Sequence, residues 1–197
     1  MQAMLRILFG AVLALAASAV RADEQLWERL RAGGLVLLMR HAETTPGTGD
    51  PPGFRLEDCA TQRNLSIAGR EQARAVGAAL ARRGVKIATV LSSPWCRARE
   101  TAMLAFGRAE IWRELDSMHH DRSRREAQNE AVRRRIAAFR GPGNLAFVGH
   151  GANILSLTGI HPGMGGMVVV APGGPEGFTI VGRVEPGDVL SDRSEAR

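Results

Sequence analysis

The chain has 197 residues, of which 45% are hydrophobic and 5% aromatic, and it carries a formal net charge of +6. This length fits one domain, and the hydrophobic fraction is sufficient for a core, which excludes an intrinsically disordered chain. Nearly all the basic residues are arginine, with Lys86 as the single lysine. Because a guanidinium group holds phosphate or carboxylate at two points, this composition favours an anionic partner, although high-GC coding would produce the same bias.

Residues 1–22 have the features of a signal peptide. Arg6 gives a weakly positive start, and the apolar run over 7–17 has signal-peptide length but is too short to span a bilayer comfortably. Small-residue cleavage patterns follow, and we favour cleavage after Ala22, which removes two arginines and no acid and leaves a net charge of +4. We expect the mature protein in the periplasm or secreted, with no stable membrane insertion; an uncleaved membrane anchor is the alternative.

The first strand of the mature chain ends in two ionisable residues. Five apolar residues, 35–39, stop abruptly at Arg40-His41. A short continuous apolar run is typical of a strand buried on both faces in a parallel sheet. Open α/β folds bind ligands at the carboxyl edge of such strands, so Arg40 and His41 lie where chemistry is expected. The plain alternative is a strand end that turns polar on reaching water.

The other elements follow from apolar runs of strand length, helical periodicity and Gly or Pro turns. We predict helices over residues 24–31, 66–83, 94–106, 121–140 and 152–158, and strands over 35–39, 87–92, 110–112, 145–148, 167–171 and 178–184. This alternation predicts a three-layer α/β/α sandwich with a mostly parallel central sheet, formed by one domain over residues 23–185. Residues 44–64 are expected to form a long loop beside the site, and residues 186–197 a disordered tail.

Three of the predicted strands are followed closely by residues suited to phosphate chemistry. These are Arg40-His41 after the first strand, Arg97 after the second, and His150 after the strand over 145–148. All should project at the same edge of the sheet, where two guanidinium groups can hold the oxygens of a phosphoryl group. A neutral imidazole can act as the nucleophile, and a second, protonated one can stabilise charge in the transition state.

Four segments in order resemble the histidine phosphatase superfamily, in its phosphoglycerate-mutase-like branch. They are Leu38-Met39-Arg40-His41-Ala42-Glu43; Leu65-Ser66 with Gly69; Ser92-Ser93-Pro94 with Arg97 and Glu100-Thr101-Ala102; and Gly149-His150-Gly151. The resemblance covers nearly all of residues 35–160 and implies the phosphoglycerate-mutase-like fold. It implies that His41 is the nucleophile and becomes a phosphohistidine, that Arg40 and Arg97 bind the phosphate, and that His150 contacts the same phosphate. It implies no metal or other cofactor.

The motifs do not identify the residue that protonates the leaving group. Gly151 stands where phytase-like acid phosphatases carry an aspartate as proton donor, which disfavours that branch. In the mutase-like branch a glutamate after the third strand does this work, and Glu114 and Asp116 occupy the corresponding region without a convincing motif. We favour Asp116, although a solvated loop carboxylate is the simpler interpretation of either residue. Glu43 is a further candidate for the pocket, in a supporting role.

Arg63, Asn64 and the two cysteines lie beside these motifs. Arg63 and Asn64 occupy a place where the family often has substrate contacts, so Arg63 is either a third phosphate-binding arginine or a surface residue. In an oxidising compartment Cys59 and Cys96 are expected to form a disulfide; two free buried thiols are the alternative. If both cysteines are near the pocket, the disulfide ties the long loop to the site.

Two further features have a plain structural interpretation. His119 and His120 are adjacent, so their side chains diverge, and no ligand set accompanies them; we expect surface residues rather than a metal site. The arginines between 122 and 135 invite a nucleic-acid interpretation, but no stacking aromatics are interleaved with them. Pairs spaced i,i+4 such as Glu130–Arg134 indicate a solvated helix face instead, and we predict no nucleic-acid partner.

Together these observations predict an exported, metal-independent phosphomonoesterase that acts on a small phosphorylated substrate through a phosphohistidine. Exported members of this branch that dephosphorylate lipopolysaccharide core sugars have a similar size and location, so a cell-envelope phosphate is a reasonable substrate. One alternative is a non-catalytic phospho-ligand binding or regulatory protein on the same fold. Another is a phosphohistidine-protein phosphatase, which fits the small size but conflicts with the signal peptide. The sequence does not predict the oligomeric state.

Overall fold

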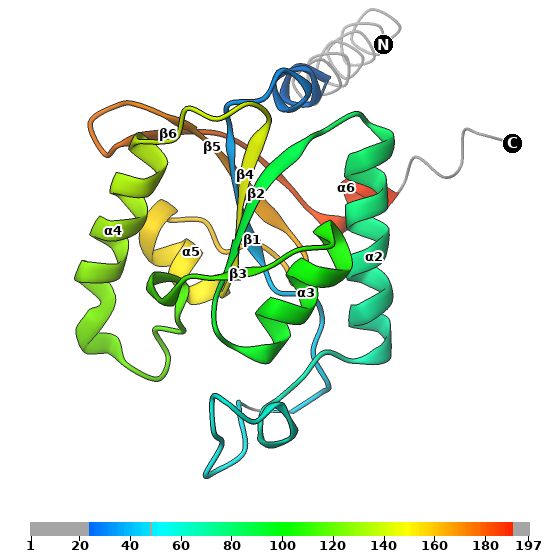
Figure 1. Cartoon of the computed structure of the whole chain (residues 1–197), viewed down its shortest axis with the longest axis vertical. Coiled ribbons are helices and arrows are strands. Elements are labelled where there is room, and N and C mark those ends of the chain that lie inside the picture. The colour runs from blue at the N-terminus through cyan, green and yellow to red at the C-terminus, as the bar shows by residue number, and fades with distance from the viewer. Residues whose placement is uncertain (1–23, 48, 191–197) are drawn as a thin grey trace, which may run out of the picture.

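The computed structural model describes residues 24–47 and 49–190, which fold into a central sheet between two layers of helices (Figure 1). The strands of the described residues are β1 (Val36–Arg40), β2 (Ile87–Ser92), β3 (Glu110–Ile111), β4 (Asn144–Gly149), β5 (Met167–Pro172) and β6 (Phe178–Val184). The helices are α2 (Ile67–Arg82), α3 (Cys96–Phe106), α4 (Arg125–Ala137), α5 (Gly151–Thr158) and α6 (Pro186–Leu190), with short 3-10 turns η1 (Cys59–Thr61), η2 (Arg113–Leu115) and η3 (Arg122–Arg124). Residues 24–32 are also helical. The predicted α/β/α sandwich is confirmed.

The sheet is mixed but mostly parallel, with the strand order β3-β2-β4-β1-β5-β6. β3, β2, β4 and β1 run parallel to one another, whereas β5 is antiparallel to both of its neighbours. Arg40 of β1 lies opposite Gly149 of β4, and Ser92 of β2 lies opposite Val148. The chain therefore leaves β1, β2 and β4 at the same edge of the sheet, as the apolar runs predict.

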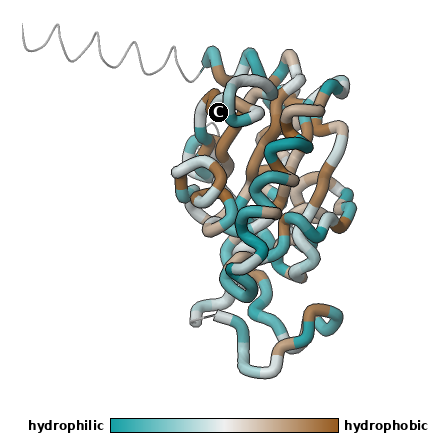
Figure 2. Tube along the Cα trace, turned by 90° about the vertical axis from the view of Figure 1, so that its left-hand side faces the viewer, coloured by the Kyte–Doolittle hydropathy of each residue, from teal (hydrophilic) through white to brown (hydrophobic). Residues whose placement is uncertain are grey.

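Both faces of the sheet are buried, which explains the continuous apolar run of β1. Leu37 and Met39 pack with residues of α2, α3, α6 and the helix over 24–32, whereas Val36 and Leu38 pack on the other face with residues of α4 and α5. Figure 2 shows the hydrophobic strands enclosed by more hydrophilic helices. Burial of each aliphatic side chain contributes about 1.5–3 kcal/mol, so β1 anchors the sheet on both sides and fixes the position of its polar end.

The helix α2 begins and ends where the local sequence predicts. Ser66 caps it by accepting the backbone N–H of Gly69 at 2.9 Å, and Gly84, with a φ of +75°, follows its last turn. A Cβ at Gly77 would lie 2.0 Å from the carbonyl oxygen of Ala105, so this glycine lets α2 lie directly against α3. The position of α3 matters for function because its first turn carries Arg97.

The helix α4 is shorter than the predicted helix over 121–140. Asp121 accepts the backbone N–H of Ser123 at 3.0 Å and caps the turn η3, and the α-helix begins only at Arg125. The aspartate side chain offers the backbone a local partner that competes with regular helix formation. Val132 and Ile136 are buried as predicted.

The C-terminal end of the described chain is ordered further than the sequence predicts. Residues 186–190, expected to belong to a disordered tail, form α6, because Val189 is buried in the same core cluster as Val76 and Leu80 of α2. The rest of the predicted tail and the predicted signal peptide over 1–22 lie outside the described residues. None of the helices described by the structure is long and apolar enough to cross a membrane.

Candidate active site

The carboxyl edge of β1, β2 and β4 brings together the residues predicted to handle phosphate. The backbone N–H of His41 donates to the carbonyl oxygen of Gly149 at 2.9 Å, which joins the chain segments that leave β1 and β4. The imidazole rings of His41 and His150 lie 5.6 Å apart between centroids, at an interplanar angle of 66°. Arg40, His41, Arg97 and His150 therefore line one pocket, although they follow three separate strands.

His41 directs one ring nitrogen to the backbone and leaves the other for the pocket. Its Nδ1 lies 2.8 Å from the carbonyl oxygen of Ala42, and because a carbonyl only accepts, Nδ1 carries the proton and Nε2 carries the lone pair. The residue is buried, and its pKa is lowered to about 3, mainly by burial and further by the charges of Arg97, Arg40 and Arg63. The imidazole is thus neutral near pH 7, the state in which it is a nucleophile.

His150 is held beside His41 by a serine. Its Nε2 lies 2.9 Å from Oγ of Ser93, and only 3% of the residue is exposed. Burial lowers the pKa of His150 well below 6.5, and the charges of Arg97 and His41 lower it further. The sequence pattern includes Ser93 in a motif but assigns it no role; its place directly after a buried strand is the signal that points to the site.

Three arginines line the pocket, and each keeps a buried donor without an acceptor. Arg40 donates from Nη1 to the carbonyl oxygen of Pro162 at 3.1 Å, but in the described part of the chain the Nε groups of Arg40, Arg63 and Arg97 have no hydrogen-bond partner. A buried donor left unsatisfied costs about 1–3 kcal/mol. An anion with several oxygens can accept from all three. Arg63, for which the sequence leaves two interpretations open, therefore lies in the pocket rather than on an unrelated surface.

Asp50 is a pocket residue that the sequence patterns do not single out. Its side chain is 2% exposed, and its Oδ1 lies 2.9 Å from Nη1 of Arg97 and accepts the backbone N–H of Arg63 at 2.9 Å. Its Oδ2 lies 3.5 Å from Nε2 of His120. Among the described residues, Asp50 is the one acidic residue in the pocket lining. The only sequence signal for it is the expectation that the loop over 44–64 lies beside the site.

All the histidines of the chain line this same pocket, which has a volume of about 340 Å³. They are His41, His119, His120, His150 and His161. His119 and His120 are exposed, as predicted, but they stand at the rim of the pocket, where His120 stacks on Trp95 with ring centroids 4.4 Å apart. Within the residues that the structure describes, no group of three or more His, Cys, Asp or Glu side chains is arranged to hold a metal ion.

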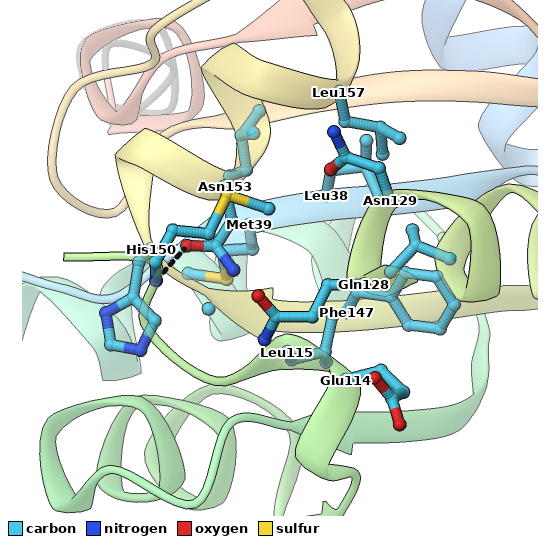
Figure 3. A pocket seen from close by; sticks show the side chains of 14 residues that line it. Leu38, Met39, Glu114, Leu115, Gln128, Asn129, Phe147, His150, Asn153 and Leu157 are labelled. Atoms are coloured by element: carbon cyan, nitrogen blue, oxygen red, sulfur yellow. Dashed lines mark hydrogen bonds between the residues drawn. The ribbon is translucent and has the colours of Figure 1, made fainter. Parts of the chain in front are cut away.

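A second, mostly apolar pocket lies behind His150, between the sheet and the helices α4 and α5 (Figure 3). Its volume of about 30 Å³ leaves room for only one or two water molecules, so it is a gap in the packing rather than a ligand site. Beside it, Gln128 and Asn153 donate to the carbonyl oxygen of Asp116 at 3.1 and 2.7 Å, and Oδ1 of Asn153 accepts the backbone N–H of Met118. These bonds hold the segment that carries the two rim histidines.

The predicted proton donor, Asp116, lies next to the pocket but does not line it. Its Oδ1 accepts the indole N–H of Trp95 at 2.6 Å and the backbone N–H of Ser117 at 2.7 Å, and the residue lines a neighbouring pocket. The alternative donor, Glu114, lies 3.5 Å from Arg124 and borders the small apolar pocket. Neither carboxylate therefore belongs to the lining that contains His41.

Two predicted substrate contacts also lie outside this lining. Oε1 of Glu43 accepts from the hydroxyl of Ser66 at 3.4 Å, at the start of α2. The Asn64 side chain donates to the carbonyl oxygen of Cys59 and faces a different pocket. Of these two adjacent residues, Arg63 lines the phosphate pocket and Asn64 does not.

The predicted disulfide is present and fastens the long loop to the site. Cys59 of η1 is bonded to Cys96, the first residue of α3, with 5.7 Å between the Cα atoms. Gln62 adds a second tie, because its Oε1 accepts the backbone N–H of Cys96 at 3.0 Å. The loop, in cyan in Figure 1, lies beyond the carboxyl edge of the sheet. This attachment brings Asp50 and Arg63 of the loop to the pocket.

Gly151 lies close to the side chains of His161 and Arg40, at the position where phytase-like enzymes carry an aspartate after the second histidine. A Cβ at this position would lie 2.5 Å from Nε2 of His161 and 3.2 Å from Cδ of Arg40. A side chain here would require the His161 ring to move and Arg40 to shift by a few tenths of an ångström. Because Gly151 carries no carboxyl group, this position supplies no proton donor.

The fold and the site together define a class of protein: an α/β sandwich in which paired histidines and three arginines form an anion pocket at the sheet edge, suited to phosphoryl transfer. Residues 36–143, more than half of the chain, match the model of the histidine phosphatase superfamily (branch 1). The chain belongs to this superfamily and is a histidine phosphatase of phosphoglycerate-mutase-like fold.

Solved structures of phosphatases share this fold at low sequence identity. The protein histidine phosphatase SixA, complexed with tungstate, has a TM-score of 0.58 and 19% identity, over 79% of this chain and 99% of that chain. The mycobacterial glucosyl-3-phosphoglycerate phosphatase has a TM-score of 0.55 and 15% identity, over 74% and 96%. The alpha-ribazole phosphatase from Shigella flexneri has a TM-score of 0.53 and 16% identity, over 74% and 94%. The sequence matches none of the curated proteins with which it was compared.

Proposed function

We propose that this histidine phosphatase is an exported, metal-independent phosphomonoesterase that acts on a small phosphorylated substrate through a phosphohistidine at His41. The state of His41 carries the proposal. Its Nδ1 is committed to Ala42, and its Nε2 has no hydrogen-bond partner among the described residues. The pocket around it contains three arginines whose Nε donors likewise lack an acceptor there. A neutral nucleophile among cationic donors matches the requirements of phosphoryl transfer.

In the first step, the Nε2 lone pair of His41 attacks phosphorus, and the bond from phosphorus to the ester oxygen breaks. Arg40, Arg63 and Arg97 hold the non-reacting oxygens and offset their charge. A dianionic phosphoryl group beside His150 favours a proton on that ring, because an adjacent opposite charge stabilises the cation. The protonated ring then adds positive charge where negative charge develops in the transition state.

We assign the proton donor to Asp50. As the one acidic residue that lines the pocket within the described part of the chain, it is the carboxyl group placed to give a proton to a leaving group there. The exposed ring of His120, 3.5 Å from Oδ2, provides a route for that proton from solvent.

The proton balance then closes over one turnover. The Asp50 carboxyl group gives its proton to the departing oxygen, which leaves as an alcohol. The carboxylate takes a proton from the water molecule that attacks the phosphohistidine. The bond from phosphorus to nitrogen breaks, its electron pair returns to Nε2 of His41, and inorganic phosphate leaves with Asp50 protonated again.

Two features support export and a substrate of the cell envelope. Residues 1–22 have the sequence features of a signal peptide, and the disulfide between Cys59 and Cys96 fits an oxidising compartment, where such bonds persist. Phosphorylated envelope components are the phosphate esters that an enzyme in this compartment meets.

The test compares the mature protein with the His41→Ala variant, without added metal and with a chelator present. The substrates are p-nitrophenyl phosphate, a panel of envelope phosphates and a phosphohistidine peptide, which represents the alternative protein-phosphatase activity. We expect turnover by the mature protein and a loss of at least about 10³-fold in the variant, since removal of a nucleophile abolishes the covalent route. Equal turnover by both proteins, or none on any substrate, would contradict the enzyme and favour a binding protein on the same fold.

A further inference from the structure

A groove distinct from the phosphate pocket opens at the Cys59–Cys96 disulfide, and we call it the disulfide groove. It has a volume of about 460 Å³, and its lining includes both cysteines, Asn64, Arg70, Arg99 and Met103. No described residue lines both this groove and the phosphate pocket. The two are nevertheless neighbours along the backbone, because Asn64 directly follows Arg63 of the pocket and Cys96 directly precedes Arg97.

The two cysteines of the bond differ in exposure and in their surroundings. Cys59, in the short turn η1, is exposed, whereas Cys96, the first residue of α3, is only 5% exposed. An attacking thiolate therefore reaches Cys59 more readily. The sulfur that then leaves is that of Cys96, and the positive end of the 11-residue helix stabilises a thiolate at this position. Attack at Cys59 is thus favoured both by access and by the leaving group.

The charges of the groove favour a thiol that carries carboxylate groups. Arg99 is exposed and, within the part of the chain that the structure describes, forms no ion pair. Arg70 lies 2.6 Å from Glu100, which also lines the groove. Two arginines and one glutamate leave the lining with a net positive charge, which attracts an anionic molecule. Met103, which is 51% exposed, provides an apolar contact for the rest of such a molecule.

The disulfide joins the loop over 44–64 to α3 at a place that affects the phosphate pocket. Gln62 of the loop accepts the backbone N–H of Cys96, so this bond and the disulfide both end on Cys96. Arg97, the next residue of α3, donates to Asp50 at 2.9 Å and to the carbonyl oxygen of Arg63 at 3.5 Å. Opening the disulfide leaves these pocket contacts without the covalent tie beside them. Asp50 and Arg63 are then held less firmly against the phosphate.

We propose that Cys59 is a site of reversible S-thiolation by a small carboxylate-bearing thiol, and that opening the disulfide there weakens the binding of phosphate esters beside His41. The inference rests on the proposed function, because the regulated reaction is the one assigned to His41. Closure of the bond in an oxidising compartment would then give the exported enzyme its full affinity.

The exchange is balanced without a further reactant. The thiolate of the small molecule forms a bond to Sγ of Cys59, the bond between the two cysteines breaks, and its electron pair stays on Sγ of Cys96. The protein disulfide is the oxidant, and the thiol is the reductant. In the reverse step, the Cys96 thiolate attacks Sγ of Cys59 and releases the small thiolate.

Mass spectrometry of the folded protein tests the site of attack. The mature protein is incubated with glutathione, a tripeptide thiol with two carboxylates, without denaturant, and free thiols are then alkylated. We expect glutathione on Cys59 and the alkyl group on Cys96, with the far-UV circular dichroism of a folded chain. Removal of glutathione before alkylation should restore the disulfide. An adduct on Cys96, or opening only together with unfolding, would overturn the proposal.

A charge variant tests the recognition of the thiol. Arg99→Gln should slow opening by glutathione about two- to fivefold, the scale of an exposed charge pair, but should not change opening by the neutral 2-mercaptoethanol. Arg74→Gln, an exposed arginine of α2 outside the groove, should leave both rates unchanged. Equal slowing with both thiols in Arg99→Gln, or no slowing with either, would contradict recognition of the carboxylates.

Kinetics and calorimetry test the consequence for phosphate. On opening, the KM for p-nitrophenyl phosphate and the Kd for inorganic phosphate should rise at least about tenfold, the scale of one charge-assisted hydrogen bond. The double variant Cys59→Ser/Cys96→Ser, which lacks both cysteines of the chain, should show raised values with and without glutathione. Unchanged values in the opened, folded protein would overturn the regulation, although turnover would still support the phosphatase. Absent turnover with thiol-dependent phosphate binding would support the regulation and contradict the proposed reaction.

Discussion

The carboxylate of Asp50 meets the guanidinium group of Arg97 at 2.9 Å inside the phosphate pocket, although the two residues are 47 positions apart. Both side chains are almost completely buried. The Cys59–Cys96 disulfide fastens the loop that carries Asp50 to the start of α3, the helix that carries Arg97. One ion pair therefore couples the position of the loop to the group that binds phosphate.

Replacing Asp50 with asparagine should separate good from poor leaving groups. Because p-nitrophenolate leaves without a proton, Asp50→Asn should reduce kcat/KM for p-nitrophenyl phosphate less than tenfold. For alkyl phosphates, which need a general acid, the loss should be about 10²–10⁴-fold. The measurement is a plot of kcat/KM against the pKa of the leaving alcohol for both proteins.

Two further variants decide what Asp50 does. Asp58→Asn removes a charge from the same loop, but Asp58 pairs with Arg55 outside the pocket, so the plot should not change. A uniform loss on all substrates in Asp50→Asn would mean that Asp50 only positions Arg97. A leaving-group dependence in Asp116→Asn instead would return the role to the donor that the sequence favours.

The lowered pKa of His41 predicts a specific pH dependence of stability. In the unfolded chain the imidazole takes up a proton below about pH 6.5, whereas in the folded chain it does so only near pH 3. The free energy of unfolding should therefore fall as the pH decreases from 6.5 towards 3, by about 1.4 kcal/mol per pH unit for this residue. Urea denaturation between pH 4.5 and 7.5 should give a shallower slope for His41→Gln than for the unaltered protein.

Nuclear magnetic resonance gives the matching direct check on the same ring. The His41 signals should keep the chemical shifts of a neutral imidazole, protonated on Nδ1, from pH 8 to at least pH 5. A titration midpoint near 6.5, or a stability slope identical in His41→Gln, would show that the ring is not held neutral by burial and the arginines.

Removing the disulfide should weaken both stability and phosphate binding. In the chain-entropy model, a crosslink between residues 37 positions apart stabilises the folded state by about 4 kcal/mol, so the double variant Cys59→Ser/Cys96→Ser should lose about 2–4 kcal/mol of unfolding free energy. Because Asp50 and Arg63 belong to the same loop, the inhibition constant for inorganic phosphate should also rise. Unchanged phosphate inhibition in a folded double variant would mean that the loop holds its position without the crosslink.

The predictable part of the site lies at the ends of buried strands. Arg40, His41 and His150 follow continuous apolar runs, and the parallel register of β1 and β4 places such ends at one edge. Local patterns also predict the cap of α2, because a capping residue is recognised from a short segment. They predict the pairing of Cys59 with Cys96 because the N-terminal segment indicates an oxidising compartment.

The features that could not be predicted are positioned by the paths of loops and by contacts between distant segments. Asp50 reaches the pocket through the path of the loop over 44–64, which no periodic pattern specifies. The carboxylate of Asp116 accepts the indole N–H of Trp95 instead of lining the pocket. Local sequence patterns do not predict this contact, because the two residues belong to different segments. The order of α6 depends similarly on the burial of Val189 against α2.

The central claim, a phosphohistidine at His41, can be measured directly. The Asp50→Asn variant should slow attack by water on the intermediate, so rapid quenching with p-nitrophenyl phosphate labelled with ³²P should trap up to one phosphate per chain. The label should be stable in alkali and labile in acid, should map to His41 by mass spectrometry, and should be absent from the Asp50→Asn/His41→Ala double variant. Turnover without any trapped label, or label on another residue, would contradict the account.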